Sequence, residues 1–120
     1  MSITIHIFYR GEKGAARAFA REMMESGVVG RIRAKEGNLR YEYFLPAEDP
    51  ETVLLIDAWA DQHALDLHHA SPVMDEIIRL REKYDLHMRV ERYIPDAGGI
   101  PDADRSFIRA VGHDPKEETL

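Results

Sequence analysis

The chain contains no cysteine among its 120 residues. Disulfides, zinc–thiolate sites, iron–sulfur clusters and thiol nucleophiles are therefore excluded. It also lacks an apolar run close to the roughly 20 residues of a membrane helix, and residues 1–10 lack the basic start and apolar stretch of a secretory signal. The formal charge of −6 disfavours binding to nucleic acid or to an anionic membrane. We expect a soluble cytoplasmic protein without either partner.

Strong catalytic and cofactor motifs are also missing. There is no phosphate loop, dinucleotide fingerprint, nucleophile elbow or paired-histidine metal helix. His63 and His68 are five residues apart and His68 and His69 are adjacent, so neither pair places two imidazoles on one helix face. No metal is expected from a local motif, and only a site built from distant residues stays open.

The most informative stretch is residues 53–72, which reads as a strand that runs directly into a helix. Val53 to Ala60 is apolar enough for a strand buried on both faces, and Trp59, the only tryptophan, closes it. Asp61 is a predicted helix N-cap, and Ser71-Pro72 predicts the start of a second helical segment with Ser71 as its cap. A large aromatic at a strand end near a helical histidine predicts a pocket wall.

The remaining elements follow from hydrophobic periodicity. Ile3, Ile5 and Ile7 alternate with polar residues, which places His6 on the opposite face, either a half-wet sheet surface or a pocket. Residues 28–37 read as a solvated connector because Gly30 weakens any helix there. The other predicted elements are strands 2–9, 38–45 and 86–94, helices 12–27 and 73–84, and a short helix from about residue 101.

The predicted order is strand, helix, strand, strand, helix, strand. With right-handed crossovers this gives an α+β ferredoxin-like βαββαβ fold with a four-stranded antiparallel sheet and helices on one face. We expect this domain to span residues 1–95, and residues 96–120 to form a partly mobile C-terminal extension. The other sheet face would be bare yet partly apolar, so we expect a homodimer.

Asp57 interrupts the apolar third strand, and a buried unpaired carboxylate is costly. It either forms an ion pair with Arg40 or Arg89, or is an acid or base with a perturbed pKa in a pocket. More broadly, the chain offers aromatic and hydrogen-bonding side chains that suit an apolar ring ligand held by a few polar contacts, or that are plain core and surface. They are Asn38, Tyr41, Tyr43, Trp59, His68 and Arg89.

The stretch from residue 36 to residue 72 resembles the antibiotic biosynthesis monooxygenase (ABM) family, in particular its quinol monooxygenases. The shared pattern is Glu36-Gly37, then Tyr41, then Asp57 and Trp59, and finally Asp61, Ala64-Leu65, His68 and Ser71-Pro72. The resemblance covers about residues 3–94. Two departures stand out: Asp57 replaces the usual glutamate, and Val73 stands where many members have a second histidine.

The resemblance implies a dimeric αβ barrel and a monooxygenase that needs no metal or flavin, with molecular oxygen as co-substrate and a quinol or phenol as substrate. It also leaves open a haem-degrading enzyme, a signalling-metabolite-processing enzyme or a non-catalytic binding protein of the same fold. We expect the ring to lie between sheet and helices, with His68 as proton acceptor, while His63 and His69 stay open as alternatives for the inward histidine. The predicted catalytic residues are His68, Trp59 and Asn38, and the predicted substrate-binding residues are Tyr41, Tyr43, Asp57, Arg89 and His6.

Overall fold

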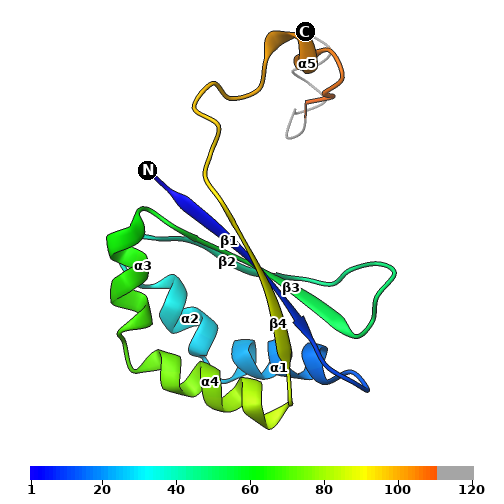
Figure 1. Ribbon diagram of the computed structural model, residues 1–120, viewed down its shortest axis with the longest axis vertical. Coiled ribbons are helices and arrows are strands. Elements are labelled where there is room, and N and C mark those ends of the chain that lie inside the picture. The colour runs from blue at the N-terminus through cyan, green and yellow to red at the C-terminus, as the bar shows by residue number, and fades with distance from the viewer. Residues whose placement is uncertain (111–120) are drawn as a thin grey trace, which may run out of the picture.

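The computed structural model describes residues 1–110 and consists of one antiparallel sheet with helices packed on one side (Figure 1). The strands are β1 (Ile3–Arg10), β2 (Asn38–Phe44), β3 (Thr52–Trp59) and β4 (His87–Tyr93), in the spatial order β2-β3-β1-β4. The helices are α1 (Ala15–Glu25), α2 (Val28–Arg33), α3 (Gln62–His69), α4 (Val73–Lys83) and the short α5 (Asp102–Arg105). The predicted α+β ferredoxin-like βαββαβ fold is confirmed.

The register of the sheet separates its two faces. Along β1, Ile3 pairs with Trp59, Ile5 with Asp57 and Ile7 with Leu55. These side chains point to the helices, since residues directly opposite each other in a ladder share a face. The intervening residues of β1 point to the face that no helix covers. His6 lies on that outer face, opposite Glu91 of β4.

The hydrophobic core lies between the inner sheet face and α1 to α4. Phe19 and Met23 of α1, Ile32 of α2, Leu65 of α3 and Ile77 of α4 are all buried in it. Asp61 caps α3 as predicted, because its Oδ1 accepts a hydrogen bond from the Ala64 backbone nitrogen at 2.8 Å.

Two local predictions are wrong. Residues 28–33 form helix α2 rather than a connector, because Val28, Val29 and Ile32 are buried and their packing outweighs the weak helix propensity of Gly30. Ser71 does not cap α4 with its side chain. Its hydroxyl instead donates to the carbonyl oxygen of His68 at 2.6 Å.

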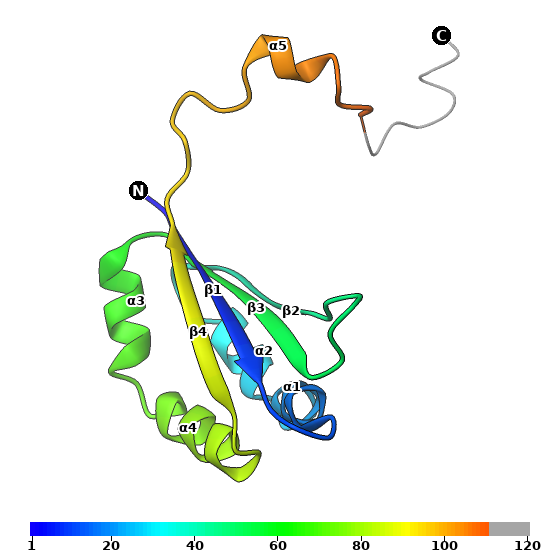
Figure 2. The same cartoon turned by 45° about the vertical axis from the view of Figure 1, so that its right-hand side comes forward.

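The C-terminal segment after β4 leads away from the sheet (Figure 2). Its residues are exposed from residue 94 to residue 110, and α5 begins one residue after Pro101. The domain boundary at residue 95 remains a prediction. The expected mobility of the chain end falls partly on residues 111–120, which lie outside the described part of the structure.

Candidate functional site

A cavity of about 230 Å³ lies between the inner sheet face and helices α3 and α4. Its wall is mostly apolar, with Ile5 and Ile7 on β1, Leu55 on β3, and Met74 and Ile77 on α4. Polar groups enter it at few points, which is the usual composition of a small-molecule site. Those groups come from Tyr9, Tyr41, Asp57, His68, His69 and Arg81.

Asp57 is a buried carboxyl on the floor of this cavity. One of its oxygens accepts a hydrogen bond from the indole nitrogen of Trp59 at 2.7 Å. Burial raises the pKa of the Asp57 carboxyl to about 7, although the hydrogen bond from Trp59 partly offsets the rise. The predicted ion pair is wrong, because Arg40 pairs with Glu42 and Arg89 with Glu91 on the outer face.

His68 is the histidine of α3 that turns inward. It is 3% exposed, whereas His63 and His69 are exposed, as the helical period places neighbouring residues on different faces. Its ring stacks on Trp59, with centroids 4.7 Å apart and an angle of 24° between the planes. Burial lowers the pKa of His68 to about 4, and the charges of Lys35 and His69 act in the same direction. The imidazole is therefore neutral at pH 7.

Two tyrosines complete the polar lining near Asp57. Tyr9 of β1 and Tyr41 of β2 are both buried, at 2% exposed each. Burial and the nearby Asp57 charge both raise the pKa of Tyr9, and burial raises the pKa of Tyr41. Both phenols therefore stay protonated at neutral pH and can donate hydrogen bonds.

The predicted site residues are only partly brought together. Tyr41, Asp57 and His68 line the cavity. Trp59 does not line it, but donates a hydrogen bond to Asp57 and stacks on His68. Tyr43 packs edge-on against Phe19 instead, with centroids 6.4 Å apart. Asn38 uses its amide to donate to the carbonyl oxygens of Arg40 and Ala58, and it does not line the cavity.

His6 and Arg89 lie on the outer sheet face, away from this cavity. The His6 ring packs against Tyr93 with centroids 4.7 Å apart, and the Arg89 guanidinium lies 4.0 Å above the Phe8 ring centre. The structure therefore does not bring these two residues together with His68.

Sequence reasoning missed three polar residues of the site. Tyr9 was overlooked, although the alternation of β1 places it on the same inner face as Ile5 and Ile7. Arg81 reaches the cavity from the last turn of α4, where a cation usually signals only a favourable helix end. Lys35, whose amino group contacts His68, lies in the segment that was predicted to be a solvated connector.

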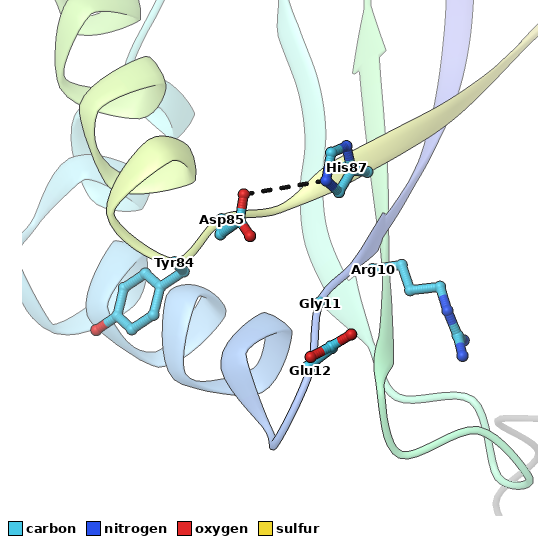
Figure 3. Close-up of a pocket in the computed structure, with 6 residues that line it drawn as sticks. All are labelled: Arg10, Gly11, Glu12, Tyr84, Asp85 and His87. Carbon is cyan, nitrogen blue, oxygen red and sulfur yellow. Dashed lines mark ion pairs between the residues drawn. The ribbon is translucent and has the colours of Figure 1, made fainter.

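A second hollow, of about 360 Å³, opens where β1 leads into α1 and α4 leads into β4 (Figure 3). Its rim carries Arg10, Glu12, Asp85 and His87, with 4.0 Å between His87 Nε2 and an Asp85 oxygen. Both residues of that pair are largely exposed. None of the predicted site residues lines this hollow.

Residues 1–110 contain neither a metal-ligand cluster nor a helix that could cross a membrane. Within residues 1–110 no group of three or more histidine, aspartate or glutamate side chains is arranged to hold a metal ion. In the same part of the chain, no helix has both the length and the hydrophobicity that crossing a membrane requires.

Comparison with known proteins gives a family and a fold. Residues 2–80 match the family model described as "Antibiotic biosynthesis monooxygenase". No curated protein sequence matches the chain.

Several solved structures are similar. A candidate antibiotic biosynthesis monooxygenase from Deinococcus radiodurans has a TM-score of 0.68 at 18% identity, covering 80% of this chain and 93% of that one. A protein from Pseudomonas aeruginosa has a TM-score of 0.67 at 23% identity, covering 80% and 95%. A possible oxidoreductase from Bacteroides thetaiotaomicron has a TM-score of 0.67 at 14% identity, covering 77% and 95%. At these identities the likeness shows the fold alone.

Proposed function

Because the chain belongs to the antibiotic biosynthesis monooxygenase family, we propose that it is a cofactor-independent monooxygenase of a small quinol or phenol. The ring of the substrate lies in the cavity between the inner sheet face and helices α3 and α4, with Asp57 as the group that receives its proton. The coarse assignment rests on the family. The substrate class and the residue roles rest on the cavity.

The size and lining of the cavity support a single-ring substrate. An apolar cavity of roughly 150 Å³ is enough to hold benzene, and this cavity measures about 230 Å³. The pockets of drug-sized ligands start at about 300 Å³. A substituted single ring therefore fits better than a macrocycle such as haem.

The observation that carries the proposal is the position of Asp57, a buried carboxyl that lines an apolar cavity. A base works best when its pKa is close to the working pH, and burial brings the pKa of Asp57 to about 7. A neutral-pH population of the carboxylate therefore faces an apolar cavity, where it can take a phenolic proton. Among residues 1–110, no other carboxyl lines the cavity.

The overall reaction balances without an added reductant. Asp57 takes one phenolic proton, and the quinolate that forms is electron-rich enough to pass an electron to molecular oxygen. A quinol and O₂ then give a hydroxyquinone and water: one oxygen atom enters the ring and the other leaves as water. The quinol supplies all four electrons that reduce O₂. The protein binds the ring, moves protons and keeps water away from the intermediate.

The other polar groups stabilise the oxygen atoms of the ring. Arg81 places a cation at the wall, and the Tyr9 and Tyr41 phenols remain donors. Such preorganised donors stabilise a developing phenolate. Trp59 holds the Asp57 carboxyl in place through its indole N–H.

The test is oxygen uptake with a panel of hydroquinones in metal-free and flavin-free buffer. We expect uptake with single-ring quinols. For each oxygen atom of O₂ that enters the ring, the other should be released as water. Met74→Trp, which fills the cavity from α4, should abolish uptake, whereas Met24→Trp at an exposed position of α1 should not. No uptake with any quinol would contradict the proposal.

The oxygen-uptake assay, together with a haem titration, separates the alternatives. Turnover that consumes no oxygen would indicate a processing enzyme for a small metabolite. A Soret band on haem titration, followed by loss of haem upon reduction, would indicate haem degradation. Binding of the ring without any turnover would indicate a binding protein.

We also propose that a second copy of the chain covers the outer sheet face. Phe8, Leu54 and Ile56 are only half-buried there, although they belong to the two central strands. The same face carries the pairs Arg40–Glu42 and Arg89–Glu91, so a two-fold axis can bring opposite charges together. Light scattering at micromolar concentration should give the mass of a dimer, and a monomer mass would contradict this.

A further inference from the structure

Lys35 lies just after helix α2 and reaches the rear of His68. Its Nζ is 2.9 Å from His68 Nδ1 and 2.6 Å from the hydroxyl oxygen of Ser71. The Ser71 hydroxyl in turn lies 2.6 Å from the carbonyl oxygen of His68. The three side chains and one carbonyl group form a closed ring of contacts.

The protons shared among Lys35, Ser71 and His68 can be assigned one by one. A serine hydroxyl has one proton, and Ser71 donates it to the His68 carbonyl oxygen, so toward Lys35 its oxygen can only accept. A lysine ammonium carries three protons and accepts none. Lys35 therefore donates to Ser71 and to His68 Nδ1. In a neutral imidazole whose Nδ1 accepts, the proton resides on Nε2.

The fold holds Lys35 in this position. The turn after α2 contains Gly37 at φ +85°, and a Cβ there would lie 2.6 Å from the Ala64 Cβ of α3. The Gly37 carbonyl oxygen also accepts a hydrogen bond from the Ala60 backbone nitrogen at 2.8 Å. The turn is thus packed directly on α3, and Lys35 is drawn toward the helix that carries His68.

The opposite ring nitrogen of His68 remains available to the cavity. In the described part of the chain, His68 Nε2 makes no protein hydrogen bond. The fully buried side-chain polar atoms without a partner there are Arg17 Nε and the Tyr43 hydroxyl, and Nε2 is not one of them. Nε2 is therefore not fully buried, and His68 lines the cavity, which leaves this nitrogen free for a ligand there. The stack on Trp59 fixes the ring plane.

We infer that Lys35 is a positioning residue that locks His68 in its Nε2–H tautomer, so that His68 offers the cavity a hydrogen-bond donor rather than a proton acceptor. The donor would bind an oxygen atom of the ligand while Asp57 takes the proton. Only this division of roles rests on the proposed function. The tautomer itself is a property of the protein without substrate.

The direct test is nitrogen NMR of protein with ¹⁵N-labelled histidine, without substrate, at pH 7. The chain has six histidines, so the spectrum of His68→Gln identifies the signals of His68 by their absence. We expect a proton on Nε2 and none on Nδ1. A proton on Nδ1, or an even mixture of tautomers in the wild-type protein, would overturn the inference whatever the protein catalyses.

Variants of Lys35 test whether this residue fixes the tautomer of His68. Lys35→Met keeps the length of the side chain and removes its donors, so His68 should show both tautomers. Its pKa should also rise, because the Lys35 charge that lowers it is gone, while burial and the neighbouring His69 remain. Lys35→Arg should restore the single tautomer. Lys83→Met is the matched control, because Lys83 pairs with Glu22 elsewhere.

A kinetic readout then separates the inference from the proposed function. If quinol turnover exists, Lys35→Met should lower kcat by roughly tenfold to a hundredfold, the range seen when the partner that orients a functional histidine is removed from a metal site. KM should change much less. If there is no turnover but the tautomer shift occurs, the proposed function fails and the positioning role stands. An unchanged NMR spectrum in Lys35→Met would overturn the positioning role.

Discussion

The two faces of the sheet treat similar carboxyl groups in opposite ways. Asp57 on β3 and Glu91 on β4 lie opposite neighbouring residues of the same strand, Ile5 and His6. On the inner face, burial raises the pKa of Asp57 to about 7. On the outer face, hydrogen bonds from Tyr93 and Arg89 lower the pKa of Glu91.

The difference shows that alternation along a strand decides the chemistry of a residue as much as its packing. The outer-face acids Glu42 and Glu91 each form an ion pair with an arginine. Asp57 has an indole N–H and no cation within hydrogen-bonding distance in the described part of the chain. A carboxyl whose pKa lies close to neutral pH is the kind of group that acid–base catalysis uses.

The largest expected effect is that of Asp57→Asn on activity. The amide still accepts the hydrogen bond from Trp59 but cannot take a proton, so kcat for oxygen uptake should fall by roughly two to four orders of magnitude. Asp66→Asn is the matched control, since Asp66 is exposed on α3 and its side chain accepts a hydrogen bond from Gln62 away from the cavity. An Asp57→Asn protein with wild-type kcat would contradict the assignment of Asp57 as the base.

The same substitution should also change how stability depends on pH. The pKa of Asp57 is higher in the folded chain than in the unfolded one, so its contribution is complete below about pH 4 and is lost as the pH rises to about 7. Three pKa units correspond to about 4 kcal/mol. Asp57→Asn should therefore be more stable than wild type at pH 8, with little difference at pH 4, as measured by urea unfolding. Parallel pH profiles would show that Asp57 titrates normally.

His68 should matter as a donor. His68→Leu removes the Nε2–H group and should lower kcat by roughly a hundredfold, the usual loss when one such donor is removed. His68→Gln keeps an N–H donor and should retain most of the activity. The prediction that His68 is itself the proton acceptor leads to the opposite result, since glutamine cannot take the proton. Oxygen uptake by the two variants decides between these roles.

The smallest effects should come from the outer face. Arg89→Met removes the ion pair with Glu91, which is exposed in the single subunit, so the free energy of unfolding of the dissociated subunit should change by no more than about 1 kcal/mol. His6→Gln should likewise leave kcat for oxygen uptake unchanged. A large loss of activity in either variant would mean that the outer face takes part in the reaction, and the contrast between the faces would fail.

The fold could be predicted from the sequence because its signals are local. Alternation in residues 3–9, the cap at Asp61 and the stripe from Val73 to Tyr84 each identify an element. Helix α2 was missed because only six residues form it, and tertiary burial rather than propensity stabilises them.

The site could be predicted only in part, because its residues meet through register. The face of Asp57 was readable from the period of two, and so was its separation from Arg40 and Arg89, although the structure was needed to show the partner. The contact between Lys35 and His68 joins residues 33 positions apart. No periodic pattern reports such a contact.

The most direct test of the central claim is the pH dependence of kcat/KM for oxygen uptake, measured with a hydroquinone that stays un-ionised from about pH 4 to about pH 9. This ratio reports the ionisation of the free enzyme. Besides Asp57, the cavity contains His68 with a pKa near 4, the protonated Tyr9 and Tyr41, the exposed His69 and the cationic Arg81. With Asp57 as the base, kcat/KM should rise with pH and reach half its maximum near pH 7. A half-maximum near pH 4 would make His68 the base and contradict the account.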